Sequence, residues 1–365
     1  MGFGFPSYNQ QSNGVGLVGE ALGEQEALEG EVFRGSAGWQ LDHVLKRAGI
    51  KREEFAFIDN VLHCRPPNNK LNWSGTAQQA IHQCAHFLDD TIQQMKPKAI
   101  IALGGTALGR LTQQGGMRIL RNRGFIFDSP YNIPIVGTYH PSYLLPRKRE
   151  KSSAKYTWVM IMDIRKAIRV AEEKRWLVPQ HYLMDPTIDQ AREFMGEYIR
   201  TPDVKLAWDI ETLYKMANKN EQTLKLENAQ TVTRLSMAFR PGYSMSIPYD
   251  PLFRREIIQP IMRMNRPKTG WNSSGFDLPI VIFQEGWEMN GILYDAMDQF
   301  HVFQPNIERN LEFATSILTD HLRPWKHLSQ SDPVYYSCVD GDATISNSVQ
   351  LDLIMNDIQV PDYGV

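Results

Sequence analysis

The stretch Lys205-Leu206-Ala207-Trp208-Asp209-Ile210-Glu211-Thr212 has the pattern of an apolar strand that ends in two acidic residues. Successive side chains of a strand point to opposite faces, so Asp209 and Glu211 point to the same side. Two carboxylates at one place repel each other unless a cation lies between them, and oxygen ligands suit Mg²⁺ or Mn²⁺. The stretch predicts a divalent-cation site at a strand end, and a solvated strand end is the alternative that it leaves open.

Two later segments add polar side chains in the same half of the chain. The segment Trp271-Asn272-Ser273-Ser274-Gly275-Phe276-Asp277 supplies an amide and a carboxylate at the start of a helical stretch. The segment Tyr336-Ser337-Cys338-Val339-Asp340 places Tyr336 and Asp340 four residues apart, on one helical face. In this order the three segments resemble the motifs of the DEDD exonuclease family with a tyrosine, which includes the proofreading domains of DNA polymerases.

This resemblance covers roughly residues 178–355 and implies a ribonuclease H-like mixed sheet with a 3′→5′ DNA exonuclease site. It implies that Asp209, Glu211 and Asp340 hold one metal ion and that Asp209 shares a second, with two Mg²⁺ or Mn²⁺ ions in all. Asp277 would act on the second ion, through water. Tyr336 would orient the attacking water and Asn272 would bind substrate, whereas Asp342 is expected to be structural because it lies on another helical face.

The first half alternates strand and helix signals. Strands are expected at residues 15–18, 55–59, 99–103 and 133–138, and helices at residues 37–48, 77–95, from 106 onward and 155–170. Strands separated by helices predict a three-layer α/β/α domain with a parallel sheet. In the second half we expect a helix at residues 188–199 and an antiparallel hairpin of residues 231–239 and 243–249. The predicted domains are residues 1–172 and 185–365, joined by a linker of residues 173–184.

Three segments of the first half form a second group of motifs. They are Gly19-Glu20-Ala21-Leu22-Gly23-Glu24-Gln25-Glu26, running on to Phe33-Arg34-Gly35, then Asn60-Val61-Leu62-His63-Cys64-Arg65-Pro66-Pro67, and Thr138-Tyr139-His140-Pro141-Ser142. Together they resemble the uracil-DNA glycosylase superfamily, closest to its iron–sulfur-bearing bacterial branch. The resemblance covers about residues 13–170.

This second resemblance implies roles for four residues. Glu20 would orient the hydrolytic water, Phe33 would stack on a flipped base, Asn60 would read the uracil edge, and His140 would stabilise charge on the departing uracil. In the loop of residues 143–151, Leu144 is expected to wedge into DNA while Arg147 and Lys148 bind phosphates. Leu22 and Ala27 depart from the family pattern, in which Pro and Asp are usual. The N-terminal C-x-x-C of the iron–sulfur branch is missing, so we expect no cluster.

Chain length, cysteine count and charge are consistent with an intracellular two-domain protein. The chain has 365 residues, a net charge of −2 and three cysteines, which predicts two cytoplasmic domains without a disulfide framework or a membrane segment. Residues 1–175 hold 23 Lys/Arg against 16 Asp/Glu, and the remaining residues hold 16 against 25. The two resemblances together imply a repair or replication enzyme of a bacterial or phage-infected cell that acts on DNA 3′ ends and uracil-containing DNA. The alternative is a proofreading accessory of a separate DNA polymerase, whose first domain only binds DNA or senses uracil.

Overall fold

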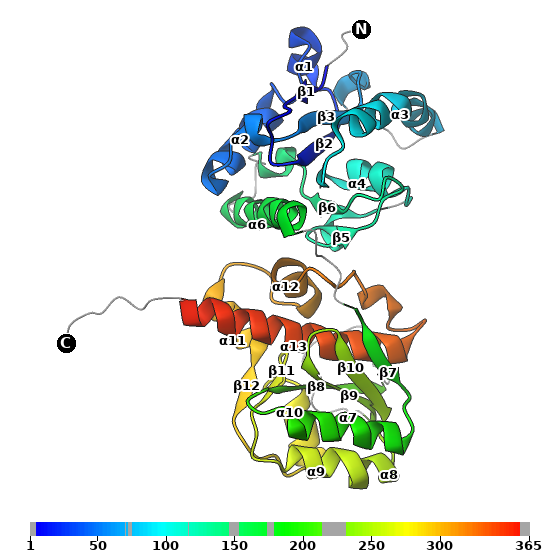
Figure 1. The fold of residues 1–365 in the computed structure, drawn as a ribbon, viewed down its shortest axis with the longest axis vertical. Helices are drawn as coiled ribbons and strands as arrows, with labels where there is room; N and C mark the ends of the chain where they lie inside the picture. Colours follow the sequence, from blue (N-terminus) through cyan, green and yellow to red (C-terminus); the bar gives the residue numbers. More distant parts are fainter. Residues whose placement is uncertain are drawn as a thin grey trace, which may run out of the picture. The chain divides into compact units, whose positions relative to one another are not determined.

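The computed structural model describes residues 5–69, 71, 75–115, 117–145, 153–173, 179–213 and 231–357. The chain divides into two compact units, Met1–Leu177 and Val178–Val365, and each is described by itself (Figure 1). Within the described ranges, no helix combines the length and the apolar character needed to cross a membrane.

The first unit is built on a six-stranded sheet in the order β1-β3-β2-β4-β6-β5. Its strands are β1 (Ser7–Tyr8), β2 (Val15–Ala21), β3 (Phe57–Leu62), β4 (Ala99–Leu103), β5 (Ile126–Phe127) and β6 (Ile135–Thr138). The central strands β3, β2, β4 and β6 run parallel. Every residue of β4 is buried, as expected for a strand that is covered on both faces.

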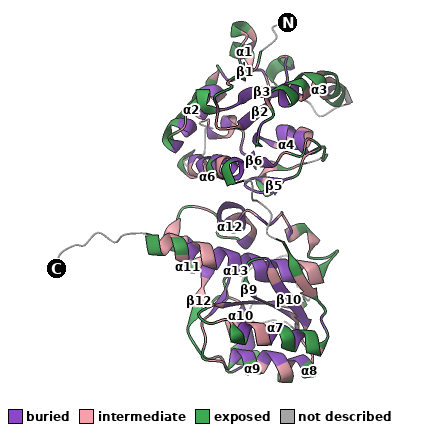
Figure 2. Ribbon diagram, in the orientation of Figure 1, coloured by how far each residue is buried: buried purple, intermediate pink, exposed green. Residues whose placement is uncertain are grey.

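Helices cover both faces of this sheet (Figure 2). One face carries α3 (Gly75–Met95) and α4 (Gly105–Thr112), and the other carries α2 (Ser36–Ala48) and α6 (Ser153–Glu173). The shorter elements are α1 (Glu24–Glu29), α5 (Ile119–Asn122) and the 3₁₀ turns η1 (Arg52–Glu54), η2 (Pro67–Asn69) and η3 (Pro141–Leu144). The predicted α/β/α architecture is confirmed. The predicted parallel sheet is confirmed in its four central strands, and the edge strands β1 and β5 extend it by pairing antiparallel with β3 and β6.

The second unit also contains a six-stranded sheet, in the order β12-β11-β8-β9-β10-β7. Its strands are β7 (His181–Met184), β8 (Leu206–Leu213), β9 (Thr231–Arg240), β10 (Tyr243–Pro248), β11 (Lys268–Gly270) and β12 (Leu293–Asp295). Strands β8, β9 and β10 are antiparallel neighbours, whereas β7 pairs parallel with β10 and β11 pairs parallel with β8. The predicted mixed sheet is confirmed.

One face of the second sheet is crossed by the long helix α13 (Pro333–Asp357), which contacts β8, β9 and β10. The opposite face packs an apolar core against α7 (Ile188–Arg200) and the helical stretch that follows β10. That stretch comprises α8 (Pro251–Phe253), the π-helical turn η4 (Arg254–Ile258) and α9 (Gln259–Met262). The remaining helical elements are α10 (Asp277–Pro279), η5 (Ile280–Gln284), α11 (Ala296–Phe303), α12 (Leu311–Leu318) and η6 (Lys326–Leu328).

The junction between the units differs from the sequence prediction. Residues 173–184 were expected to form a linker, yet His181–Met184 forms β7 and extends the second sheet beside β10. The strand has partly exposed side chains and lies beside two prolines, so its sequence has the composition of a loop. Tyr182 ties β7 into the unit, because its hydroxyl donates to the buried Asp342 at 2.6 Å.

Two candidate active sites

The acidic end of β8 lies inside the second sheet, between β11 and β9. Asp209 lies opposite Ser236 of β9, and Glu211 lies opposite Arg234. The register shifts directly after Glu211, so the strand is irregular at the point where its second carboxylate emerges. The strand alternation predicted from the sequence therefore sets both carboxylates on one face of the sheet.

Helix α13 supplies the other acidic ligand because it approaches the same face closely at Gly341. A Cβ atom added at Gly341 would lie 2.8 Å from Ser244 Oγ and 3.1 Å from Ser236 Oγ. Since Ser236 is the partner of Asp209 across the sheet, this contact brings the neighbouring Asp340 beside Asp209. One oxygen each from Asp209, Glu211 and Asp340 lies within 4.8 Å of the others.

Asp277 lies next to this cluster without joining the trio. Its carboxylate is 3% exposed, and its Oδ1 accepts the N–H of Ile210, the residue between the two β8 carboxylates, at 3.1 Å. Asn272 is placed differently. It is exposed, its φ is +60°, and its backbone N–H donates to Asp295 Oδ1 at 2.9 Å. Its side-chain oxygen folds back over the turn, toward Gly275.

The crowding of carboxylates shifts their acidity. Burial, and then the charges of Asp277, Asp340 and Glu211, raise the pKa of Asp209 well above its ordinary value. Burial and Asp340 raise the pKa of Glu211 to about 8, and burial raises the pKa of Asp277 to about 7. Glu211 Oε1 is buried and has no hydrogen-bond partner within the described part of the chain. A divalent cation would supply the missing partner and the missing positive charge, so these residues fit a metal centre.

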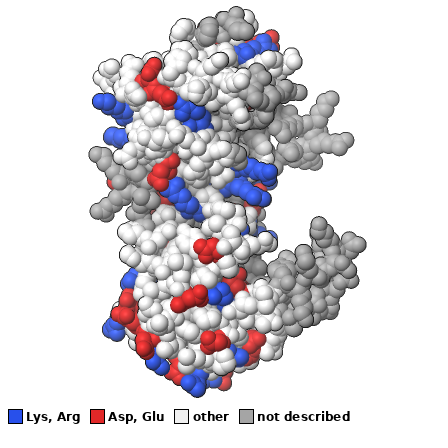
Figure 3. All heavy atoms as spheres, turned by 90° about the vertical axis from the view of Figure 1, so that its right-hand side faces the viewer, with Lys and Arg blue, Asp and Glu red and all other residues white. Residues whose placement is uncertain are grey.

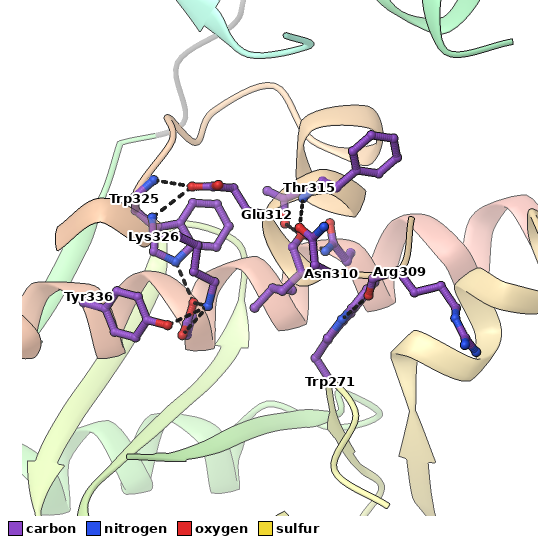
Figure 4. Close-up of polar contacts among 12 residues, drawn as sticks. Trp271, Arg309, Asn310, Glu312, Thr315, Trp325, Lys326 and Tyr336 are labelled. Carbon is purple, nitrogen blue, oxygen red and sulfur yellow. Dashed lines mark hydrogen bonds and ion pairs between the residues drawn. The ribbon is translucent and has the colours of Figure 1, made fainter. Parts of the chain in front are cut away.

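Sequence reasoning assigned no role to Lys326, which contacts the same site (Figure 4). Its Nζ donates to Asp340 Oδ1 at 2.8 Å, to Asp340 Oδ2 at 2.9 Å and to the Tyr336 hydroxyl at 2.7 Å. The adjacent Trp325 Nε1 donates to Asp340 Oδ1 at 2.5 Å. Glu312 Oε1 accepts the backbone N–H groups of Trp325 and Lys326 at 2.8 and 2.9 Å. The signal in the sequence was a tryptophan and a lysine shortly before the Tyr336 helix.

Asp342, two residues beyond Asp340, belongs to a different network. Besides the Tyr182 hydroxyl, it accepts the backbone N–H of Gly242 at 2.9 Å and lies 3.2 Å from His321 Nε2. The hydrogen bonds with His321, Tyr182 and Gly242 lower the pKa of Asp342 despite its burial. These contacts join α13 to β7 and to the turn between β9 and β10.

The second candidate site lies in the first unit, at the carboxyl ends of parallel strands. The strand order changes direction between β2 and β4, and in parallel sheets such a switch point leaves a crevice at the strand ends. Gly19 of β2 pairs with Asn60 of β3 at this place. Glu20 follows Gly19 and accepts a hydrogen bond from the Thr106 hydroxyl, in the first turn of α4.

Phe33 and Asn60 both face Gly19. A Cβ atom on Gly19 would lie 2.4 Å from the Phe33 ring and 2.4 Å from Asn60 Oδ1, so only glycine leaves room for both groups. Asn60 is 2% exposed, and its Oδ1 has no partner within the described residues. Phe33 has a φ of +56°, which is rare for a residue with a side chain. Arg52 holds this turn, because it donates to the Phe33 carbonyl at 2.7 Å and to the Gly38 carbonyl at 3.1 Å.

His140 follows β6, and its ring lies 6.2 Å from that of Phe33, centroid to centroid. Burial lowers the pKa of His140, and the charges of Glu20 and Glu26 oppose that effect. Nδ1 lies 2.8 Å from Ser142 Oγ and accepts the backbone N–H of Ser142 at 3.3 Å, an arrangement that favours the neutral tautomer with its proton on Nε2. Strand β6 is anchored below the histidine, because Thr138 donates to the buried Asp163 at 2.7 Å. The structure thus brings Glu20, Phe33, Asn60 and His140 to one end of the sheet.

Comparison with known proteins places the first unit in a family. Residues 5–163 match the model of the uracil DNA glycosylase superfamily. A type-4 uracil-DNA glycosylase of Thermotoga maritima is 39% identical over 151 residues, which are 41% of this chain and 74% of that protein. A type-4 uracil-DNA glycosylase of Archaeoglobus fulgidus is 30% identical over 154 residues, or 40% of this chain and 75% of that protein. The chain belongs to the uracil DNA glycosylase superfamily. The resemblance predicted from the sequence is confirmed for this unit.

Solved structures similar to the chain cover its C-terminal half. They include a chain described as the apo form of a nuclease, with a TM-score of 0.34, 13% identity, and coverage of 48% of this chain and 82% of that one. Escherichia coli RNase D, an exoribonuclease involved in structured RNA processing, has a TM-score of 0.30 and 13% identity, and the match covers 49% of this chain and 46% of RNase D. Likeness at this level carries no inference about activity, so the function of the second unit is inferred from its side chains.

The remaining predictions for the glycosylase unit meet different outcomes. Leu144 was predicted to wedge into DNA, but it is 2% exposed in η3, because its side chain packs inside the unit. Arg147 and Lys148 lie outside the described residues. Burial raises the pKa of the Cys64 thiol, and Cys84, with which it hydrogen bonds, raises it further, so these two thiols lie together. The expectation that no iron–sulfur cluster is bound stays a prediction.

Proposed function

We propose that this chain is a DNA-processing enzyme that joins a metal-dependent 3′→5′ exonuclease to a uracil-DNA glycosylase, with a role in DNA repair or replication. The observation that carries the exonuclease is the trio of Asp209, Glu211 and Asp340, which brings one oxygen of each residue within 4.8 Å of the others. Burial and the neighbouring negative charges raise the pKa of Asp209 and of Glu211, as expected where no cation balances them. The observation that supports the glycosylase is the meeting of Glu20, Phe33, Asn60 and His140 in a unit of that superfamily.

In the second unit, Asp209, Glu211 and Asp340 would hold Mg²⁺ or Mn²⁺, with Asp277 acting through water. Two such ions, when bound, lower the pKa of an attacking water and stabilise the leaving 3′ oxygen. The Tyr336 hydroxyl lies at the rim of the trio, on the same helical face as Asp340, where it would orient that water. Asn272 stays a proposed substrate contact, which requires its side chain to turn outward from Gly275.

In the first unit, a uracil flipped out of DNA would stack on Phe33 and present its edge to Asn60. Breaking the bond between the sugar C1′ and uracil N1 leaves negative charge on the base. The proton on His140 Nε2 can donate a hydrogen bond to that charge, because burial keeps the ring neutral and Ser142 fixes its tautomer. Glu20, held by Thr106, would orient the water that adds to C1′. This proposal uses only side chains of the first unit and water, so we expect base release to persist in EDTA.

One experiment tests both activities. Single- and double-stranded oligonucleotides, labelled at the 5′ end and carrying one uracil or thymine at the same position, are incubated with the full chain in Mg²⁺ or in EDTA. We expect a ladder of 3′-shortened products in Mg²⁺ only. We expect alkali-labile sites at uracil in both conditions and none at thymine. Binding of uracil DNA without base release at enzyme excess would favour the accessory function, in which the first unit only senses uracil.

A further inference from the structure

Lys326 places a positive charge on Asp340, one of the three carboxylates of the trio. Its ammonium group touches both oxygens of Asp340 and the hydroxyl of Tyr336, so all three of its protons have acceptors. Figure 4 shows the Lys326 side chain reaching toward α13 from the segment that follows α12. In this arrangement the lysine supplies part of the positive charge that the trio lacks.

Counting the acceptors on Asp340 shows why this lysine opposes a divalent ion. A carboxylate offers about four lone-pair positions on its two oxygens. Oδ1 already accepts from Trp325 and Lys326, and Oδ2 accepts from Lys326. A divalent cation bound at the free position of Oδ2 would lie within a few ångströms of the ammonium, and the two positive charges would repel each other.

The surroundings of Lys326 let its head group move while its backbone stays. Glu312 fixes the backbone of Trp325 and Lys326 through two hydrogen bonds. The lysine side chain is 36% exposed, whereas that of Asp340 is 5% exposed, so the ammonium lies between solvent and the buried carboxylate. Four rotatable bonds then allow it to leave Asp340 for an anion that arrives from the solvent side.

We propose that Lys326 is a positioning residue that couples divalent-cation binding to binding of the substrate phosphate. Its ammonium neutralises Asp340 while no divalent cation is bound, and it transfers to a phosphate group of the DNA end when the cation takes its place. This inference rests on the proposed exonuclease function of the second unit. We expect the site to bind divalent cations weakly by themselves and more tightly when a nucleotide is bound. By the same factor, a bound cation should raise the affinity for the nucleotide.

The test measures Mn²⁺ binding to the full chain by calorimetric titration, alone, with thymidine 5′-monophosphate, and with thymidine. The proteins are the unmodified chain, Lys326→Met, Lys326→Gln and Lys205→Met. Lys205 is the matched control, because it also pairs with an aspartate of α13, Asp352, at 2.6 Å but outside the trio. Melting temperatures check that each variant is folded.

Without nucleotide, both Lys326 variants should bind Mn²⁺ about tenfold tighter than the unmodified chain, a factor within the usual range for coupled sites. Thymidine 5′-monophosphate should tighten Mn²⁺ binding in every protein, because phosphate is itself a ligand. That factor should be about tenfold larger in the unmodified chain and in Lys205→Met than in the Lys326 variants. Thymidine should have no effect.

The coupling would be overturned if the Lys326 variants bound Mn²⁺ as weakly as the unmodified chain, or more weakly. It would also be overturned if the nucleotide tightened Mn²⁺ binding by the same factor in all proteins. An Asp209→Ala arm separates this failure from failure of the metal site. If Mn²⁺ binding is lost in Asp209→Ala, the proposed metal centre is supported, whatever the result for the Lys326 variants. If Mn²⁺ binding is the same with and without Asp209, the metal centre and the coupling both fall.

Discussion

The two candidate sites of this chain differ in charge: the first is formed mainly by neutral polar groups, and the second mainly by carboxylates. The glycosylase site of the first unit combines a neutral histidine, a buried amide and one carboxylate that already accepts from Thr106. The site of the second unit gathers four carboxylates, from Asp209, Glu211, Asp277 and Asp340, and a lysine pairs with the last of them. The difference extends to the surface, where Figure 3 shows a larger share of acidic side chains on the second unit than on the first.

This contrast separates the requirements of the two sites. Neutral hydrogen-bonding groups can be arranged for a substrate without any further ion. Carboxylates that are buried together remain partly protonated, or repel one another, until a cation binds. On this reasoning, the proposed exonuclease site would need a divalent cation, whereas the proposed glycosylase site would act without one. The predictions below would break or sharpen that difference.

Asp209→Ala should have the largest effect. It removes the carboxylate at the centre of the cluster, which should raise the activation free energy of cleavage by several kcal/mol. The rate of 3′→5′ degradation should therefore fall on the order of a thousandfold. Release of uracil should be unchanged. Single-turnover degradation of a 5′-labelled strand in Mg²⁺ measures the loss, and Asp352→Asn on the same helix is the control. Residual activity above a few per cent would contradict the two-metal assignment.

His140→Ala should produce the converse result. Loss of one preorganised donor to a developing anion costs about a hundredfold to a thousandfold in rate, so uracil release should fall by that factor in EDTA. Exonuclease activity in Mg²⁺ should not change. The measurement counts alkali-labile sites over time in uracil DNA, with the exposed His43→Ala as the matched histidine control. A loss of both activities would contradict two independent sites.

Gly341→Ala should affect the second site by geometry alone. The added methyl would meet the hydroxyls of Ser244 and Ser236, so either these side chains or α13 must shift. We expect the unfolding free energy of this unit to drop by about 1–3 kcal/mol and exonuclease activity to fall about tenfold. Gly115→Ala, where nothing lies within 4 Å of the added atom, is the control for both measurements.

The smallest expected effect is a pH dependence of stability in EDTA. The pKa of Glu211 is raised from 4.5 to about 8, so the folded state holds a proton that the unfolded chain has lost between those pH values. Stability of the second unit should therefore fall as pH rises from about 5 to 8. Each kcal/mol lost lowers the melting temperature by about 2–4 °C at this size. Calorimetric scans should show this slope in EDTA, a flatter one in Mn²⁺, and a flatter one in Glu211→Gln.

Sequence reasoning predicted the parts of these sites that follow from local pattern. Strand alternation places Asp209 and Glu211 together, and helical spacing places Tyr336 and Asp340 together. The resemblance to the uracil-DNA glycosylase superfamily gave the positions of Glu20, Phe33, Asn60 and His140, which the fold brings to one crevice.

What could not be predicted depends on contacts between distant segments. Lys326 reaches Asp340 from the three-residue turn η6, which is too short for periodicity to tell which way a side chain points. Strand β7 is stabilised by pairing with β10, and its own sequence reads as a linker. Leu144 shortly precedes a stretch of sequence rich in Lys and Arg, which suggested an exposed wedge, but only packing decides whether a leucine turns inward.

The crossing of α13 over the sheet has a consequence for synthesis on the ribosome. Domains generally fold as units, from the N-terminal side first, while the chain is being made. The glycosylase unit can therefore complete its crevice while later codons are still being translated. A nascent chain that has emerged only as far as β10 carries Asp209 and Glu211 but neither Asp340 nor the close packing at Gly341. The proposed nuclease centre thus stays unassembled until the α13 segment leaves the exit tunnel and docks.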